Sequence, residues 1–217
     1  MQDRIPELAF NEAIARESRK ARRGRNPTFS ALVELLWLLS SLVFWALGVP
    51  AGDGHSVLVI PGFGAGDIHY GPLRGWLRRL GYRAIKSGFS FNPGWSREIV
   101  DNLGRRADAE SHRSGIPVTL IGHSLGGLQA RSVAQGWPNA IRHLITLGAP
   151  LIYASGAVPS TVAFSSIYTS MDLPYAPAAH EAHARNIEVT GTHDLLGVNR
   201  QVYRLVADAL KRGSLVS

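Results

Sequence analysis

The feature that most constrains the fold is a sharp turn between a buried strand and a helix. The sequence GHSLG at 122–126 follows an apolar run over 118–121 and precedes a helical pattern over 125–135. Glycines two residues either side of a serine leave room for a strained backbone on such a turn. The turn carries the serine hydroxyl beyond the end of the strand, near the positive end of the helix dipole. We therefore predict that Ser124 is a nucleophile; the alternative is an ordinary serine in a glycine-rich turn.

Short apolar strands alternate with helical patterns along the rest of the chain, which implies βαβ units with right-handed crossovers. We predict an α/β fold, a doubly wound and mostly parallel sheet of about six strands. The 217 residues are enough for one such domain, over 51–217, and too few for two. The expected strands span 57–60, 82–85, 117–121, 141–147, 164–168 and 187–189, and the expected helices span 73–80, 96–114, 125–135 and 198–211.

A serine is a poor nucleophile unless a base accepts its proton, so a histidine and a carboxylate are needed. In this type of fold they follow the serine in the order acid, then histidine. His193 lies between the last predicted strand and the last helix, where the sheet's carboxyl edge should be. His180 and His183 fall in an alanine-rich stretch before that strand and fit exposed positions better. We therefore predict His193 as the base.

The acid is expected after an earlier strand. Asp172 follows the predicted strand over 164–168 and precedes His193 by 21 residues. Asp194 is adjacent to His193 in sequence, which directs its side chain elsewhere. We predict Asp172 as the acid; its alternative is a turn residue that bonds its own backbone.

Backbone donors for a developing oxyanion are expected at two places. One is the N–H of Leu125, directly after the serine, and the other is the N–H of Phe63 in the loop after the first strand. Glycines on both sides of Phe63 let its amide face the site. Several aromatic loop residues are candidates for an acyl groove, although we favour the hydrophobic core for most of them: Phe63, Tyr70, Phe89, Phe91, Trp95 and Tyr153.

Four sequence blocks resemble small bacterial lipases and esterases of the α/β-hydrolase superfamily. VLVIPGFGAGD is similar to their oxyanion loop, LIGHSLGG to their nucleophile turn, SIYTSMD to the block ending in the acid, and IEVTGTHDLLGVNRQV to the block holding the histidine. The resemblance covers the chain from Gly54 onward and places the acid on Asp172 and the base on His193. Pro61 stands where many lipases have histidine. The short interval from Pro150 to Phe164 leaves little or no room for a lid.

The resemblance implies a minimal α/β-hydrolase fold and a serine carboxylic-ester hydrolase that cleaves hydrophobic acyl esters through an acyl-enzyme. An acyltransferase or a thioesterase on the same triad is an alternative, because fold does not fix function. A non-catalytic, membrane-bound binding module is another. Cysteine is absent, which excludes thiolate chemistry. We expect no cofactor and no metal, since no cluster of histidines and carboxylates has metal-ligand spacing.

The first 50 residues have a different composition and are expected to be a separate segment. A basic run over 16–25 precedes residues 29–49, which are apolar all round except for Glu34 and three serines. This segment is long enough to cross a bilayer. It reads as a signal anchor, as a cleaved signal peptide, or as a helix packed on the domain or lying in the interface. We expect a possible membrane surface as partner, membrane association or export as localisation, and no nucleic acid despite the net charge of +7.

Overall fold

The fold is built on a sheet of six strands in the order β2-β1-β3-β4-β5-β6, and every pairing is parallel. The computed structural model describes residues 51–154, 156–170 and 183–213, with six residues of the N-terminal segment (9, 11–13, 15 and 16). The predicted doubly wound parallel sheet is confirmed. Its strands are β1 (Ser56–Ile60), β2 (Arg83–Lys86), β3 (Val118–His123), β4 (Ile141–Leu147), β5 (Ala163–Tyr168) and β6 (Arg185–Glu188).

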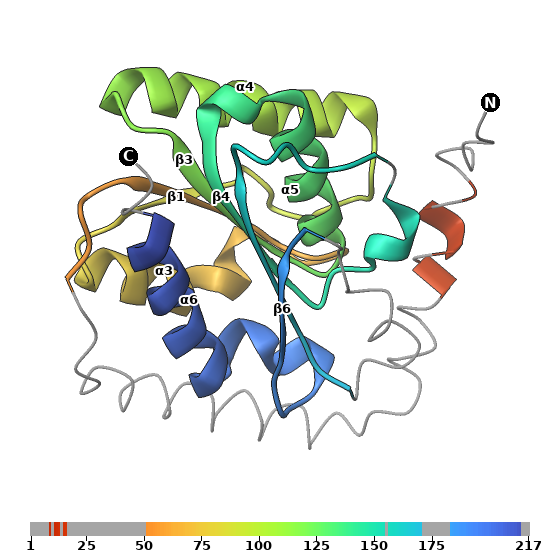
Figure 1. The fold of residues 1–217 in the computed structure, drawn as a ribbon. Coiled ribbons are helices and arrows are strands. Elements are labelled where there is room, and N and C mark those ends of the chain that lie inside the picture. Colours follow the sequence, from red (N-terminus) through yellow and green to blue (C-terminus); the bar gives the residue numbers. More distant parts are fainter. Residues whose placement is uncertain are drawn as a thin grey trace.

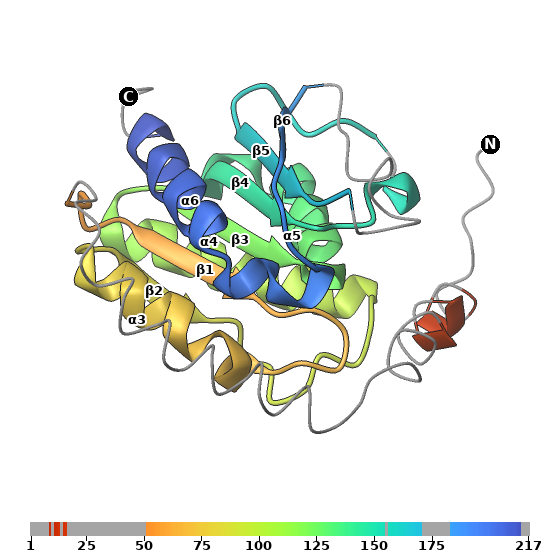
Figure 2. The same cartoon turned by 90° about the horizontal axis from the view of Figure 1, so that it is seen from below.

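Two pairs of helices cover the two faces of the sheet (Figures 1 and 2). On one face lie α3 (Gly71–Arg79) and α6 (Arg200–Gly213), and on the other lie α4 (Arg97–Ser114) and α5 (Leu125–Gly136). Each pair encloses its own apolar core against the strands. Short 3-10 helices in the loops are η2 (Asp67–Tyr70), η3 (Pro138–Ala140), η4 (Leu151–Tyr153) and η6 (His193–Val198).

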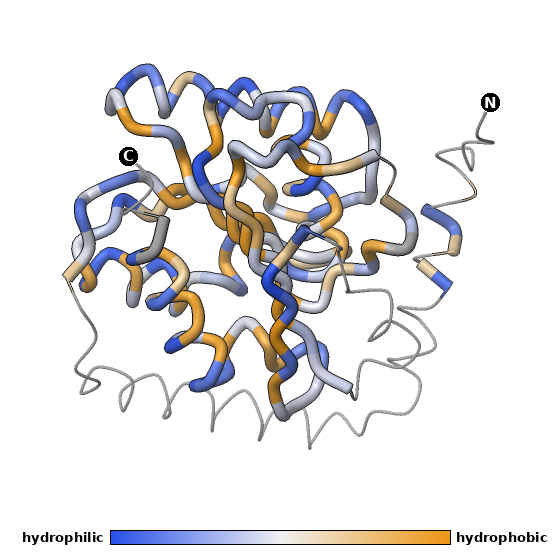
Figure 3. The backbone as a smooth tube through the Cα atoms, in the orientation of Figure 1, coloured by the Kyte–Doolittle hydropathy of each residue, from blue (hydrophilic) through white to orange (hydrophobic). Residues whose placement is uncertain are grey.

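The central strands are apolar because helices cover both of their faces. All five residues of β1 and all six of β3 are buried, which matches the continuous apolar runs seen in the sequence. Figure 3 shows these apolar strands in the middle of the molecule. The last strand differs from expectation: β6 begins at Arg185 rather than 187 and is mostly exposed. As an edge strand it lacks the apolar run that marks the buried ones.

Local capping explains the bounds of α4. The Ser96 hydroxyl accepts a hydrogen bond from the N–H of Ile99 at 3.2 Å, as an N-cap residue should. Gly115 ends the helix in the left-handed conformation, with φ +70°. These two residues fix a helix within the range that the sequence predicts.

The order of the strands places a switch point between β1 and β3. From β1 the chain moves outward to β2 and then returns to β3 on the other side of β1. The loops after β1 and β3 therefore diverge at the carboxyl edge, where sheets of this kind bind ligands. Among the described residues between β4 and β5 the only helix is η4, so no lid domain is found in that part of the chain.

The predicted apolar segment 29–49 lies outside the described residues, as does Glu34. Within the part of the chain that the structure describes, no helix has the length and apolar character needed to cross a membrane.

Candidate active site

Ser124 occupies a strained turn at the carboxyl end of β3. Its φ is +52° and its ψ is −124°, and no other described residue except glycine has a positive φ. The Ser124 N–H donates to the carbonyl of Leu147 on the neighbouring strand at 2.8 Å, and its own carbonyl accepts from the N–H of Gly127 at 2.9 Å. Such strain persists only where surrounding structure fixes it, and it clusters at functional sites. The turn predicted from the motif is therefore present.

The glycines of the motif are required by close backbone contacts. A Cβ on Gly122 would lie 2.3 Å from the carbonyl oxygen of Gly126, and a Cβ on Gly126 would lie 2.4 Å from that of Ile60. Any larger residue would push helix α5 away from β1 and β3. The spacing of these glycines around Ser124 therefore follows from packing of the turn itself.

The loop after β1 passes directly beside Ser124. A Cβ on Gly62 would lie 3.2 Å from the Cβ of Ser124. The next residue, Phe63, is half-buried and packs against Leu125 and Leu128 of α5. Leu125 is the first residue of α5, so its N–H is among those that no helical carbonyl satisfies. The two predicted oxyanion donors thus belong to segments that meet at the serine.

A buried pair of amides holds this loop in place. Asn92 and Gln129 are fully buried and hydrogen-bond each other at 3.0 and 3.1 Å. The Asn92 side chain also donates to the carbonyl of Pro61 at 2.8 Å. Its backbone carbonyl accepts from the N–H of Gly64 at 2.9 Å. The loop is therefore braced by side chains from two distant segments, which sequence reasoning missed because nothing local marks Asn92 or Gln129 as paired.

The loop that holds His193 is joined to the residue before the serine. His193 is half-buried and begins η6. The Nε2 of His123 donates to the backbone carbonyl of His193 at 2.9 Å, and the two rings lie 4.9 Å apart. Because a carbonyl can only accept, this bond fixes the proton of His123 on Nε2. The structure thus brings the loop of the predicted base to the predicted nucleophile.

Burial keeps His123 neutral. Burial, and to a smaller extent the nearby His193, lower the pKa of His123 to about 3. A neutral His123 remains a fixed hydrogen-bond donor across the physiological pH range. His123 precedes Ser124 in the chain, whereas the base is expected after the serine, so nothing in the sequence indicated this positioning contact.

Tyr70 lies between the loop that holds Gly62, the ring of His123 and helix η6. Its ring is buried and lies 5.9 Å from that of His123, and its phenol hydrogen-bonds the backbone of Gly62. A Cβ on Gly197 in η6 would lie 3.1 Å from the Tyr70 ring. Tyr70 therefore belongs to the core that supports the oxyanion and histidine loops, and not to an acyl groove.

The predicted acid, Asp172, lies outside the described residues, so its role stays a prediction. The chain just before it is fixed to the histidine loop. Thr169 is fully buried, and its hydroxyl donates to the carbonyl of Gly191 at 2.6 Å. The N–H of Val189 donates to the carbonyl of Tyr168 at 2.8 Å. The segments that precede Asp172 and His193 therefore leave the sheet side by side.

Some of the predicted aromatic residues do surround the site. Trp95 and Phe63 pack against Leu125 and Leu128, and the rings of Phe63 and Phe91 meet edge-on at 6.4 Å. Phe91 is 58% exposed and Tyr153 is 41% exposed. Phe63, Phe91 and Trp95 form an apolar rim beside the start of α5, whereas Phe89 packs on the core under α4.

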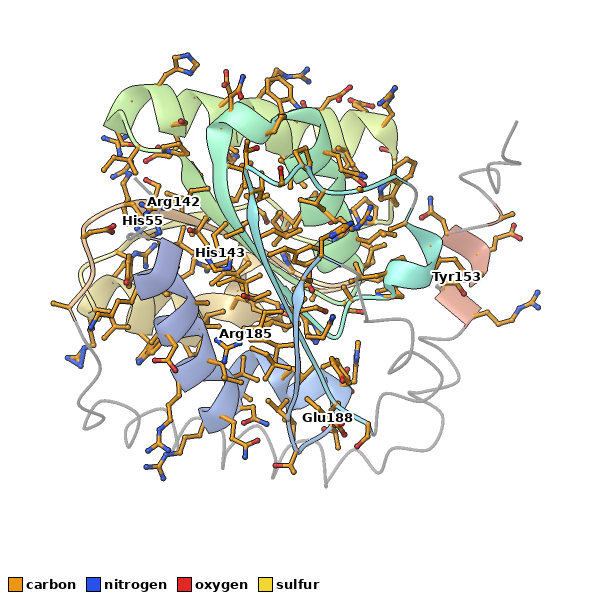
Figure 4. All side chains as sticks on the ribbon, in the orientation of Figure 1. His55, Arg142, His143, Tyr153, Arg185 and Glu188 are labelled. Atoms are coloured by element: carbon orange, nitrogen blue, oxygen red, sulfur yellow. The ribbon has the colours of Figure 1, made fainter. Side chains whose placement is uncertain are left out.

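Other histidines lie at the opposite edge of the sheet. His55 is fully buried, where its ring contacts the carboxylate of Asp53 and hydrogen-bonds the hydroxyl of Thr119 at 3.0 Å. His143 bonds Ser165 at 3.1 Å inside the sheet's amino half. Figure 4 shows His55 at one end of the molecule and Tyr153 at the other. Within the described ranges no group of histidines and carboxylates is arranged to hold a metal ion.

A doubly wound parallel sheet with a strained serine at its switch point is the arrangement of the α/β-hydrolase fold. Solved structures agree. The chain is similar to a dienelactone hydrolase from Anabaena variabilis, with 17% identity over 76% of this chain and 88% of that one and a TM-score of 0.58. It is also similar to a monoacylglycerol lipase from Paleococcus ferrophilus (12% identity, 76% and 97%, TM-score 0.58) and a carboxylesterase from Mesorhizobium loti (15% identity, 72% and 88%, TM-score 0.57). These likenesses establish the α/β-hydrolase fold.

Neither family models nor curated proteins match this sequence.

Proposed function

We propose that the protein is a serine carboxylic-ester hydrolase with Ser124 as nucleophile, His193 as base and Asp172 as acid. The observation that carries the proposal is the strained conformation of Ser124, with φ +52° at the start of α5. A packing role for the serine would not need this strain, since glycine adopts a positive φ without cost. The adjoining loops are held by buried polar contacts of His123 and Asn92, which supports a preorganised site.

In the proposed reaction His193 takes the proton of the Ser124 hydroxyl as its oxygen attacks the ester carbonyl. The backbone N–H groups of Phe63 and Leu125 bind the resulting oxyanion. His193 then protonates the leaving alcohol as the carbon–oxygen bond breaks, which leaves an acyl-serine. Water then attacks the acyl carbonyl as His193 takes its proton. The bond between the acyl carbon and the Ser124 oxygen breaks, His193 returns the proton to that oxygen, and the acid is released. Asp172 orients the imidazole and stabilises its charged form.

The apolar rim favours hydrophobic acyl esters as substrates. Phe63, Phe91 and Trp95 surround the start of α5 with aromatic surface, and Phe91 remains largely exposed. An exposed aromatic side chain at the mouth of a site is suited to contact an acyl chain. A chain-length series of p-nitrophenyl esters tests this: activity should rise from the acetate to medium and long acyl esters. Added alcohol tests for acyl transfer, which would yield new esters in place of the acid.

Labelling with a fluorophosphonate probe tests the nucleophile. The full chain should be labelled once, and Ser124→Ala and His193→Ala should not be labelled. Ser132→Ala is a matched control, because Ser132 lies on the same helix and its hydroxyl only bonds the carbonyl of Leu128 at 3.1 Å. Labelling of Ser124→Ala equal to that of the wild type, or no labelling of folded wild type, would overturn the proposal.

A further inference from the structure

A second concave surface lies along helix α4, and none of its lining residues belongs to the site around Ser124. The groove has a volume of about 740 Å³ and lies between α4 and residues 87–89, which follow β2. An adjoining cavity of about 550 Å³ is lined by β2 and the end of α3 and shares Arg106 and Glu110 with the groove. Both volumes are in the range of sites for small molecules.

One stripe of α4 forms a wall of the groove, and its polarity changes along the helix. The residues at 99, 103, 106, 110 and 113 recur at the spacing that places side chains on one face of a helix. The first two are Ile99 and Leu103, and Phe89 joins them across the groove. The last three are Arg106, Glu110 and Arg113. The groove therefore has an apolar end toward the start of α4 and a charged end toward its close.

The groove is open because it lies at the edge of the sheet. Strand β2 is the first in the strand order and pairs only with β1 among the described strands. No further strand of the described residues covers the side chains of α4 that reach past this edge. Ile99 and Phe89 are accordingly half-buried, although they contact the core under α4.

The charged end of the two cavities is strongly cationic. Five cations line them against one carboxylate, that of Glu110. Glu110 accepts hydrogen bonds from Arg113, Arg83 and Ser56, each at 2.6 Å. Arg113 is the main reason that the pKa of Glu110 falls to about 2, so this carboxylate is charged and already fully bonded.

The remaining cations have no carboxylate partner among the described residues. Arg106 donates to the carbonyl of Lys86 at 3.3 Å, and Arg78 donates to the carbonyl of Ala84 at 2.9 Å. No salt bridge joins either arginine, or Lys86, to an acid in that part of the chain. An anion in the groove can therefore bind guanidinium groups that no carboxylate of the described residues neutralises.

We propose that this groove binds a single-chain amphiphilic anion, an acyl chain that ends in a carboxylate or phosphate. The chain would lie on Ile99, Leu103 and Phe89, and the head group would bind Arg106 and its neighbouring cations. An acidic peptide paired with the free edge of β2 would use the cations alone and leave the apolar end empty, so the observations favour the amphiphile. Binding here does not depend on the catalytic role of Ser124.

Calorimetric titration of the full-length Ser124→Ala variant tests the site. Each ligand is used below its critical micelle concentration. Dodecanoate and dodecyl phosphate distinguish a carboxylate from a phosphate head. Acetate lacks the chain, and dodecyl maltoside lacks the charge. We expect one of the two anionic amphiphiles to bind one to one, and acetate and the maltoside to bind at least tenfold more weakly.

Two variants locate the binding. Arg106→Gln and Ile99→Ser should each weaken it at least tenfold. Arg105→Gln is the matched control, since Arg105 is the next residue of α4, is exposed and does not line the groove. Equal affinity in Arg106→Gln and the unchanged protein would overturn the proposal, as would binding of an acidic peptide without binding of either amphiphile. Fluorophosphonate labelling of Arg106→Gln with an intact Ser124 tests the proposed function separately and should be unchanged.

Discussion

Replacing His123 should change the stability of the protein in two ways. It removes the hydrogen bond to the carbonyl of His193, and it removes a buried group whose protonation destabilises the fold in acid. We expect His123→Phe to lower the free energy of unfolding at pH 7 by roughly 2 kcal/mol, because the carbonyl of His193 loses a buried donor. Burial also lowers the pKa of His123 from 6.5 to about 3. The contribution of a group with a lowered pKa is complete above pH 6.5 and is lost as the pH falls toward 3.

At pH 4 the unfolded chain has bound a proton at His123 that the folded protein excludes. The two and a half pKa units between 6.5 and 4 correspond to roughly 3 kcal/mol at 1.36 kcal/mol per unit. The wild type carries this acid penalty and His123→Phe does not. The stability deficit of the variant should therefore vanish or reverse between pH 7 and pH 4.

Urea unfolding followed by circular dichroism at pH 7 and pH 4 measures the difference. His123→Gln keeps an N–H donor and removes the titration, so it should lose less stability than His123→Phe at pH 7 and gain as much on acidification. Other titrating groups are common to all three proteins and cancel in the comparison. A difference in unfolding free energy between the wild type and His123→Phe that is the same at both pH values would show that His123 does not titrate with a lowered pKa.

Three further substitutions test the site and its surroundings. Gly126→Ala should lower stability by about 3 kcal/mol and abolish labelling of Ser124, because the new Cβ would lie 2.4 Å from the carbonyl oxygen of Ile60. Thermal unfolding measures the first effect and the fluorophosphonate probe the second. A variant with unchanged stability and labelling would contradict the packing argument. Asn92→Ala should lower stability by about 2 kcal/mol and reduce kcat at least tenfold with little change in KM, because the carbonyl of Pro61 and the side-chain oxygen of Gln129 each lose the hydrogen bond from the Asn92 side chain. Equal loss of kcat and rise of KM would speak against a role in positioning. Glu110→Gln should lower the free energy of unfolding by about 2 kcal/mol at pH 7. Because the carboxylate has a lowered pKa and stabilises the fold only while it is charged, this deficit should decline as the pH falls from 4.5 toward 2. A deficit independent of pH in urea unfolding would argue against the ion pair of Glu110 with Arg113.

Local sequence patterns were sufficient to predict the buried strands and the turn around Ser124. The apolar runs of β1, β3 and β4 predicted buried parallel strands because helices must cover both of their faces. The glycines around Ser124 predicted a strained turn because a positive φ and close backbone contacts exclude larger residues there. The roles of His193 and Asp172 were assigned by chain order, and both remain predictions.

The contacts by which distant segments support the site could not be predicted from local patterns. Asn92 and Gln129 are 37 residues apart, and His123 and His193 are 70 apart, so no local pattern joins them. A buried amide or imidazole is stable only with partners, and those partners are set by the packing of loops at the switch point. In the sequence, the residues of α4 that line the groove are likewise recognisable only as one face of an amphipathic helix. It becomes a groove because, among the described residues, β2 is the edge of the sheet and no other element covers that face of α4.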